Sequence, residues 1–204
     1  MIKDILYPNG FVYKFNKKFV TNLEIEPGLD KIVQRFKPKS ILELGSWHGK
    51  SAVSFANECL SQNLNTEILC VDTWLGSYEY WTTYTERLPL VLDSYDVFCS
   101  NIFADGLQNN VLPFRQTTKN AIQILKYHGV KFDLVYWDSD HSSVLQDLLM
   151  CDDVLHNDGV LIVDDYFQHQ LVKQQVEDYL QLKQKERLIL DDKIIIGSNQ
   201  IKNQ

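Results

Sequence analysis

Residues 41–51 read Ile-Leu-Glu-Leu-Gly-Ser-Trp-His-Gly-Lys-Ser, and they are the most informative segment of the chain. An apolar strand, Ser40–Leu44, runs into a glycine-containing turn, and a helical pattern, Lys50–Leu60, follows at once. This order is typical of the first unit of an open α/β sheet, in which ligands bind at the carboxyl ends of the strands. Glycines in such a turn let a ligand approach the backbone. The segment therefore predicts a ligand site at the end of the first strand.

The chain beyond this segment repeats the alternation of short apolar runs and helical stretches. Near-continuous apolar runs are typical of parallel strands that are covered on both faces. The further predicted strands are Glu67–Asp72, Val111–Gln116, Phe132–Asp138 and Gly159–Asp164. The predicted helices are Pro27–Phe36, Lys50–Leu60, Ser94–Leu107, Lys119–His128, Ser143–His156 and Gln170–Lys185. This alternation predicts an α/β fold with a Rossmann-like, doubly wound sheet.

The C-terminal part departs from the parallel pattern. Two strand candidates, Arg187–Leu190 and Lys193–Gly197, are separated only by Asp191 and Asp192. A parallel crossover needs about a dozen residues or more, so a two-residue connection can join only antiparallel strands. We therefore expect a mostly parallel sheet that ends in an antiparallel C-terminal strand pair.

Length and composition limit the domain organisation and the partners. The 204 residues fit a single domain, at about 100–200 residues per domain. We expect an N-terminal extension with a helix over 1–38 and one domain over 39–204, in which the aromatic-rich segment 76–105 is an insertion or lid. Its rings can equally belong to a dimer interface, which would make the chain a homo-oligomer, or to the core. The net charge of −7 argues against nucleic acid and membrane partners.

The cysteines and the N-terminus bear on location. The four cysteines show no CxxC spacing, so buried free thiols in a reducing compartment are expected. No signal peptide and no run of about 18 apolar residues is visible. Together these features predict a cytoplasmic protein.

Three kinds of nucleotide ligand are considered for the turn after the first strand. A phosphate-binding loop has four residues between its glycines, whereas only three separate Gly45 from Gly49. A dinucleotide needs a close-approach glycine where this chain has Trp47. S-adenosylmethionine carries no phosphate and tolerates that side chain. Asp72 can bind the ribose of NAD or of S-adenosylmethionine, or act as a helix cap or turn residue. The antiparallel C-terminal pair favours S-adenosylmethionine.

Acidic residues follow the fourth and fifth predicted strands. Asp138, Asp164 and Asp165 should meet at one edge of the sheet, and three carboxylates repel one another unless a cation neutralises them. Oxygen ligands suit a hard ion, Mg²⁺ first, with Mn²⁺ and Ca²⁺ as alternatives. His141 is a candidate general base, although His141 or Asp140 can instead cap a helix, and Asp165 can be a plain loop residue. The remaining histidines are interpreted as surface or turn residues: His48, His128, His156 and His169.

These motifs together resemble the class I S-adenosylmethionine-dependent methyltransferases, and within them the small macrocin-type O-methyltransferases, with catechol O-methyltransferase more distant. The resemblance runs from about Lys39 to Tyr166. Its carriers are Ile-Leu-Glu-Leu-Gly-Ser at 41–46 with Gly49-Lys50-Ser51, Val-Asp-Thr-Trp-Leu-Gly at 71–76, Trp-Asp-Ser-Asp-His at 137–141 and Asp-Gly-Val-Leu-Ile-Val-Asp-Asp-Tyr at 158–166. Catechol-type enzymes usually have Asp-Asn where this chain has Asp164-Asp165, and the aromatic segment 76–95 has no counterpart.

The resemblance implies a role for each matching position. Glu43, Gly45 and Ser46 would line the methionine end of the cofactor, Asp72 the ribose, and Gln116 and Thr117 the adenine. The full implied cofactor set is Glu43, Gly45, Ser46, Gly49, Ser51, Asp72, Thr73, Gln116, Thr117 and Asp138. The implied metal ligands are Asp138, Asp164 and Asp165, and the implied catalytic residues are His141 and Asp138.

The expected reaction is divalent-metal-assisted O-methylation of a small-molecule or sugar hydroxyl, with S-adenosylmethionine and Mg²⁺ as cofactors. Two alternatives stay open at this point. One is a metal-independent methyltransferase that acts on nitrogen or on a protein side chain. The other is a non-catalytic module that binds S-adenosylmethionine and in which the aspartates are structural.

Overall fold

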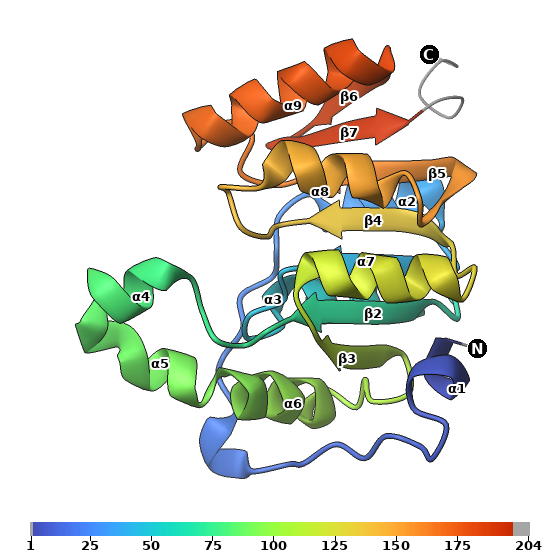
Figure 1. The fold of residues 1–204 in the computed structure, drawn as a ribbon. Coiled ribbons are helices and arrows are strands. Elements are labelled where there is room, and N and C mark those ends of the chain that lie inside the picture. The colour runs from blue at the N-terminus through green and yellow to red at the C-terminus, as the bar shows by residue number, and fades with distance from the viewer. Residues whose placement is uncertain (1, 198–204) are drawn as a thin grey trace.

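The computed structural model describes residues 2–197, which form a seven-stranded sheet in the order β3-β2-β1-β4-β5-β7-β6 (Figure 1). The strands are β1 Ser40–Leu44, β2 Glu67–Asp72, β3 Val111–Arg115, β4 Phe132–Trp137, β5 Leu155–Val163, β6 Glu186–Leu190 and β7 Lys193–Gly197. Neighbouring strands from β3 to β5 are parallel, whereas β7 is antiparallel to both β5 and β6. The Rossmann-like fold with an antiparallel C-terminal pair, predicted from the sequence, is confirmed.

Helices cover both faces of this sheet. They are α1 Ile2–Leu6, α2 Leu29–Phe36, α3 Lys50–Ser61, α4 Tyr78–Thr82, α5 Leu88–Leu92, α6 Ser94–Ala104, α7 Thr118–Tyr127, α8 Val144–Cys151 and α9 Gln170–Lys183, with 3-10 turns η1 Lys17–Phe19 and η2 Thr85–Arg87. Apolar residues of α7, α8 and α9 form one buried core with the sheet, and those of α2, α3 and α6 form the other. The molecule is therefore a three-layer sandwich (Figure 1).

The central strand β4 shows how the sequence builds both cores at once. Successive side chains of a strand point to opposite faces, so Tyr136 and Trp137 enter different layers. The Tyr136 ring contacts Phe55 of α3, with centroids 5.3 Å apart. The Trp137 indole donates a hydrogen bond to Asp147 of α8, at 3.2 Å. Both side chains are fully buried.

The eighth helix and the fifth strand differ from their predicted bounds. The helix predicted over Ser143–His156 ends at Cys151, and β5 begins at Leu155 rather than at Gly159. The pairing of β4 with β5 shifts register between Phe132 and Leu134, so the first part of β5 is an irregular extension of the strand. Residues 156–158 of this part are polar and exposed, so they carry no apolar strand signal.

Two further features concern the chain as a whole. All four cysteines are buried and free. No helix of the described residues is long and apolar enough to cross a bilayer. The segment between β2 and β3 folds into α4, η2, α5 and α6, and α4 and α5 project beyond the edge at which the arrows of β2 and β4 end (Figure 1).

Candidate functional site

The turn after β1 lies directly against the end of β4. Gly45 has a φ of 87°, and a Cβ atom there would lie 1.8 Å from the carbonyl oxygen of Asp138. The Asp138 amide also donates a hydrogen bond to the Leu44 carbonyl, at 2.8 Å. Glycine is thus required at position 45 by the neighbouring strand, a reason different from the ligand approach that the sequence suggested. The close packing places Asp138 beside the first turn.

Asp72, at the end of β2, organises the same turn. Its Oδ2 atom accepts hydrogen bonds from the amides of Ser46, at 2.9 Å, and Trp47, at 2.8 Å. Its Oδ1 atom accepts from the amide of Trp74, at 2.7 Å. A carboxylate has about four lone-pair positions, so one remains for a further donor. Asp72 therefore has the contacts of a turn residue, and its contact with a ribose stays a prediction.

Buried polar atoms lie unpaired beside this turn. Glu43 is 0% exposed and Ser46 is 4% exposed. Glu43 Oε1 accepts a hydrogen bond from the Ser51 hydroxyl at 2.5 Å. Glu43 Oε2 and Ser46 Oγ make no hydrogen bond of good geometry within residues 2–197, although Ser46 and Cys70 lie close enough to Glu43 to oppose the effect of burial on its pKa. Burial raises the pKa of Glu43. An unpaired buried polar group costs about 1–3 kcal/mol, so this pair indicates a place for a polar ligand.

The other predicted cofactor residues lie at the same edge of the sheet. Gln116 follows β3, and its backbone N–H donates to the backbone carbonyl of Asp72 at 3.1 Å. Thr117 is the N-cap of α7 and accepts from the Asn120 amide at 3.2 Å. The Thr73 hydroxyl accepts from the Leu75 amide at 3.2 Å. The Thr73 and Thr117 side chains thus make local turn contacts, Gln116 is held by its backbone, and the contact of all three with a cofactor stays a prediction.

Gly49 is the remaining predicted cofactor residue. It is the N-cap of α3 and has a φ of 89°. A Cβ atom there would lie 3.0 Å from the Phe98 ring of α6. The glycine therefore lets α6 pack close to the start of α3.

Asp164 is neutralised by a lysine that the sequence analysis did not identify. Asp164 Oδ1 accepts from Lys193 Nζ at 2.8 Å and from the Asp165 amide at 2.8 Å, and Oδ2 accepts from the Tyr136 hydroxyl. Lys193 is 1% exposed and also pairs with Glu26, at 3.1 Å. Burial by itself would lower the pKa of Lys193, but Asp164 and Glu26 raise it. The lysine is therefore a permanent buried cation.

This lysine bears on the predicted metal ligands Asp138, Asp164 and Asp165. Three donors already occupy Asp164, and one of them carries a full positive charge. Burial and the nearby charges of Asp164 and Asp165 raise the pKa of Asp138 to about 8, so at neutral pH it mostly holds a proton. Mg²⁺ prefers ionised oxygen ligands in near-ideal octahedral geometry. At Asp164 the Lys193 ammonium group therefore already supplies a positive charge that the sequence analysis assigned to a divalent cation.

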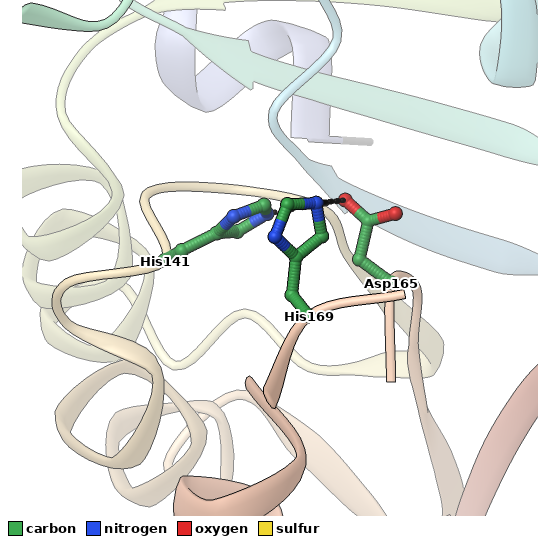
Figure 2. Close-up of side chains that lie close together, drawn as sticks. All are labelled: His141, Asp165 and His169. Atoms are coloured by element: carbon green, nitrogen blue, oxygen red, sulfur yellow. Dashed lines mark ion pairs between the residues drawn. The ribbon is translucent and has the colours of Figure 1, made fainter. Parts of the chain in front are cut away.

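Asp165 has different neighbours, two histidines that Figure 2 shows converging on its carboxylate. His141 follows β4, and its Nε2 lies 3.1 Å from Asp165 Oδ2. His169, at the start of α9, places its Nε2 4.0 Å from the same oxygen. The hydrogen bond with Asp165 raises the pKa of His141 and lowers that of Asp165. The sequence analysis missed His169, whose only signal is its four-residue spacing from Asp165.

Comparison with known proteins agrees with this geometry. A family model described as a methyltransferase domain matches residues 42–166. Curated proteins show no significant match to the chain. A similar fold occurs in an O-methyltransferase from Bacillus cereus in complex with S-adenosylhomocysteine, with a TM-score of 0.59, 15% identity, and coverage of 87% of this chain and 83% of that chain. Another occurs in a Podospora anserina methyltransferase bound to S-adenosylhomocysteine, with a TM-score of 0.62, 16% identity, and coverage of 84% of this chain and 76% of that chain. A third is the Streptomyces achromogenes O-methyltransferase of tomaymycin synthesis with S-adenosylmethionine (0.59, 11%, 98% and 100%).

Proposed function

The chain belongs to the methyltransferase domain family, and on that premise we propose that it moves the methyl group of S-adenosylmethionine to a hydroxyl of a small molecule or sugar. The single observation in this chain that carries the proposal is the pair of buried oxygens, Glu43 Oε2 and Ser46 Oγ, which make no hydrogen bond of good geometry within the described residues. They lie where the ligand of an open α/β sheet binds. The choice of oxygen as acceptor is supported by two similar folds described as O-methyltransferases.

The cofactor residues fit the chemical groups of S-adenosylmethionine. The Glu43 carboxylate can accept a hydrogen bond from the amino group of the methionine end, and the Ser46 hydroxyl can donate to its carboxylate. Asp72 keeps one lone-pair position for a ribose hydroxyl. Gln116 and Thr117, at the end of the neighbouring strand, are proposed to lie near the adenine. When bound, the cofactor supplies an electrophilic methyl group on a sulfonium.

His141 is proposed as the general base that takes the proton of the acceptor hydroxyl. Asp165 accepts from Nε2, which leaves Nδ1 of the neutral ring to receive the proton, and the carboxylate then stabilises the imidazolium. Such a base contributes roughly 10²- to 10⁴-fold to the rate. Asp138 mostly holds a proton at neutral pH, so its carboxylic acid can donate a hydrogen bond beside the turn after β1. The proposal contains no metal-dependent step.

The aromatic segment 76–105 is proposed as a cover for the acceptor. Tyr80 of α4 stacks on Trp47 of the first turn, with ring centroids 5.5 Å apart, so the segment reaches the cofactor edge. Tyr78, Trp81 and Tyr84 are exposed around it. Large exposed rings of this kind suit an apolar or aromatic acceptor. The buried free thiols support a reducing, cytoplasmic location as part of the same proposal.

Cofactor binding is tested by calorimetry with S-adenosylhomocysteine. The wild-type protein should bind it, and Glu43→Gln should weaken binding by about tenfold or more, since a charged hydrogen bond contributes about 1.5–3 kcal/mol. Glu58→Gln is the control, because Glu58 is only partly buried, lies near the C-terminal end of α3 and accepts from Gln62 there; this variant should bind as the wild type does. An absence of binding at millimolar ligand would overturn the proposal.

Methyl transfer is tested with a labelled methyl donor and a panel of hydroxyl acceptors. His141→Ala should lower kcat by about 10²- to 10⁴-fold and leave the affinity for S-adenosylhomocysteine unchanged. His156→Ala, exposed in the first part of β5, is the matched control. Activity should survive EDTA because Lys193 neutralises Asp164. If EDTA abolishes activity, the predicted metal-assisted form of the reaction replaces this one.

A further inference from the structure

The two histidines and the aspartate of Figure 2 are a donor set of their own. The ligand-capable atoms of His141, Asp165 and His169 all lie within 4.8 Å of one another. We propose that these three side chains bind a transition-metal ion of the borderline class, with Zn²⁺ the first to test. This site differs from the predicted Mg²⁺ trio in two of its three ligands, and neither histidine belongs to that trio.

The chemistry of the donors selects the ion. Imidazole nitrogen suits Zn²⁺, Cu²⁺, Fe²⁺ and Ni²⁺, whereas Mg²⁺ takes oxygen ligands and gives up its water reluctantly. Two imidazoles and one carboxylate is a ligand set that catalytic zinc ions use. The set leaves one or more positions for water, which the partly exposed side chains allow.

The distances are close to those of a bound ion. Ligand atoms about 2.0–2.2 Å from a metal lie roughly 3.0–3.5 Å from one another. His141 Nε2 and Asp165 Oδ2 are already 3.1 Å apart. His169 Nε2 is 4.0 Å from the same oxygen, so its ring needs to move toward that oxygen by at most about 1 Å to reach this range. Its side chain is 51% exposed and is free to make that movement.

The backbone holds the ligands in place before an ion binds. Asp165 has a φ of 59°, a left-handed conformation that costs a non-glycine residue energy and that clusters at functional sites. The His169 amide donates to the Asp165 carbonyl at 2.9 Å, so both ligands belong to one closed turn. Lys193, the nearby cation, is engaged by Asp164 and Glu26. The site thus keeps the negative charge of Asp165 for an incoming ion.

One consequence of the site rests on the proposed function. When Nε2 of His141 binds a metal, the proton of the neutral ring is on Nδ1, so Nδ1 can no longer accept a proton from a substrate. Zn²⁺ should therefore inhibit methyl transfer rather than support it. Inhibition should follow the occupancy of the metal site.

Binding is tested first without cofactor or acceptor, on a protein that carries no histidine tag. Co²⁺ is the probe, because its visible absorption reports coordination by protein ligands. One equivalent per chain should bind, Zn²⁺ should displace it, and Mg²⁺ in large excess should not. His169→Ala and His169→Gln should each weaken binding by at least about tenfold, since even supporting residues of metal sites contribute 10- to 100-fold. His156→Ala should bind as the wild type does.

The outcomes separate this proposal from the proposed function. Co²⁺ that shows no protein-bound absorption, or equal binding by the wild type and both folded His169 variants, overturns the metal site. Stoichiometric binding without methyl transfer to any acceptor leaves the metal site standing and removes the proposed function. With transfer established, Zn²⁺ should inhibit the wild type at the concentration that fills the site, and His169→Ala should need at least about tenfold more Zn²⁺. Equal inhibition of the two proteins overturns the link between the site and the base.

Discussion

Replacing Lys193 by methionine tests the assignment of a buried cation to Asp164. The change keeps most of the length of the side chain and removes its charge. Lys193 is 1% exposed, with Nζ 2.8 Å from Asp164 and 3.1 Å from Glu26. Glu26 retains a second partner, Lys50, at 2.9 Å. The loss therefore falls mainly on Asp164, which is itself buried.

The expected cost follows from this geometry. Removing one partner of a buried ion pair typically destabilises a protein by about 3–5 kcal/mol, because the other charge stays buried without compensation. The hydrogen bonds that Tyr136 and the Asp165 amide donate to Asp164 remain, and they reduce the destabilisation. We expect Lys193→Met to lower the free energy of unfolding by about 3–4 kcal/mol.

Urea denaturation at neutral pH measures this change, with an unaltered slope showing that the compactness of the two states is the same. Lys31→Met is the matched control: Lys31 pairs with Asp191 at 2.7 Å but is 53% exposed, and exposed pairs contribute about 0–1 kcal/mol. Adding Asp164→Asn to Lys193→Met should recover part of the loss. A Lys193→Met cost no larger than that of Lys31→Met would refute the reasoning, as would a double variant that is less stable than Lys193→Met.

Two further predictions concern the edge where β1 and β4 end. Because burial and nearby carboxylates raise the pKa of Asp138 to about 8, the folded state holds a proton that the unfolded chain releases near pH 4. The free energy of unfolding should therefore decrease as the pH rises from about 4 to about 8. In Asp138→Asn, the thermal unfolding midpoint should decrease less over this pH range than it does in the wild type. Plots of midpoint against pH that run parallel for the two proteins would contradict this. Gly45→Ala should prevent folding or cost several times more than Gly106→Ala, because its Cβ would meet the Asp138 carbonyl whereas position 106 is open. At Gly106 only the left-handed strain of about 1–2 kcal/mol applies, and equal urea midpoints would count against the close-packing argument.

The strands could be predicted wherever burial on both faces leaves an apolar run. β1 and β2 have their predicted bounds for this reason. The start of β5 could not be predicted, because residues 156–158 are exposed and polar and their pairing depends on β4. A strand held by its neighbour, rather than by its own apolar residues, has no signal in the local sequence.

The candidate site likewise has one part that could be predicted from the sequence and one part that could not. The sequence brings Asp72, Asp138 and Asp164 to one edge because parallel strands end together, and the structure has them there. Lys193 could not be paired with Asp164 in advance. In the antiparallel register of β7 on β5, Val163 lies opposite Ile194, and this register places Asp164, which follows Val163, beside Lys193, which precedes Ile194. That register is fixed by tertiary packing, and the sequence shows only a lysine at the start of an apolar strand.

Asp164 and Asp165 are identical in the sequence motif but have opposite environments in the fold. Asp164 faces the sheet interior and is neutralised by Lys193, so its charge is fixed by a side chain. Asp165 turns outward in a left-handed conformation and meets two groups whose charge depends on protons or on a bound ion. A hard cation shared by both aspartates would have to compete with an ammonium group that is part of the chain. The repulsion among the clustered carboxylates is therefore reduced by Lys193 at Asp164. Asp165 remains available to orient a base and, in our proposal, to bind a softer metal.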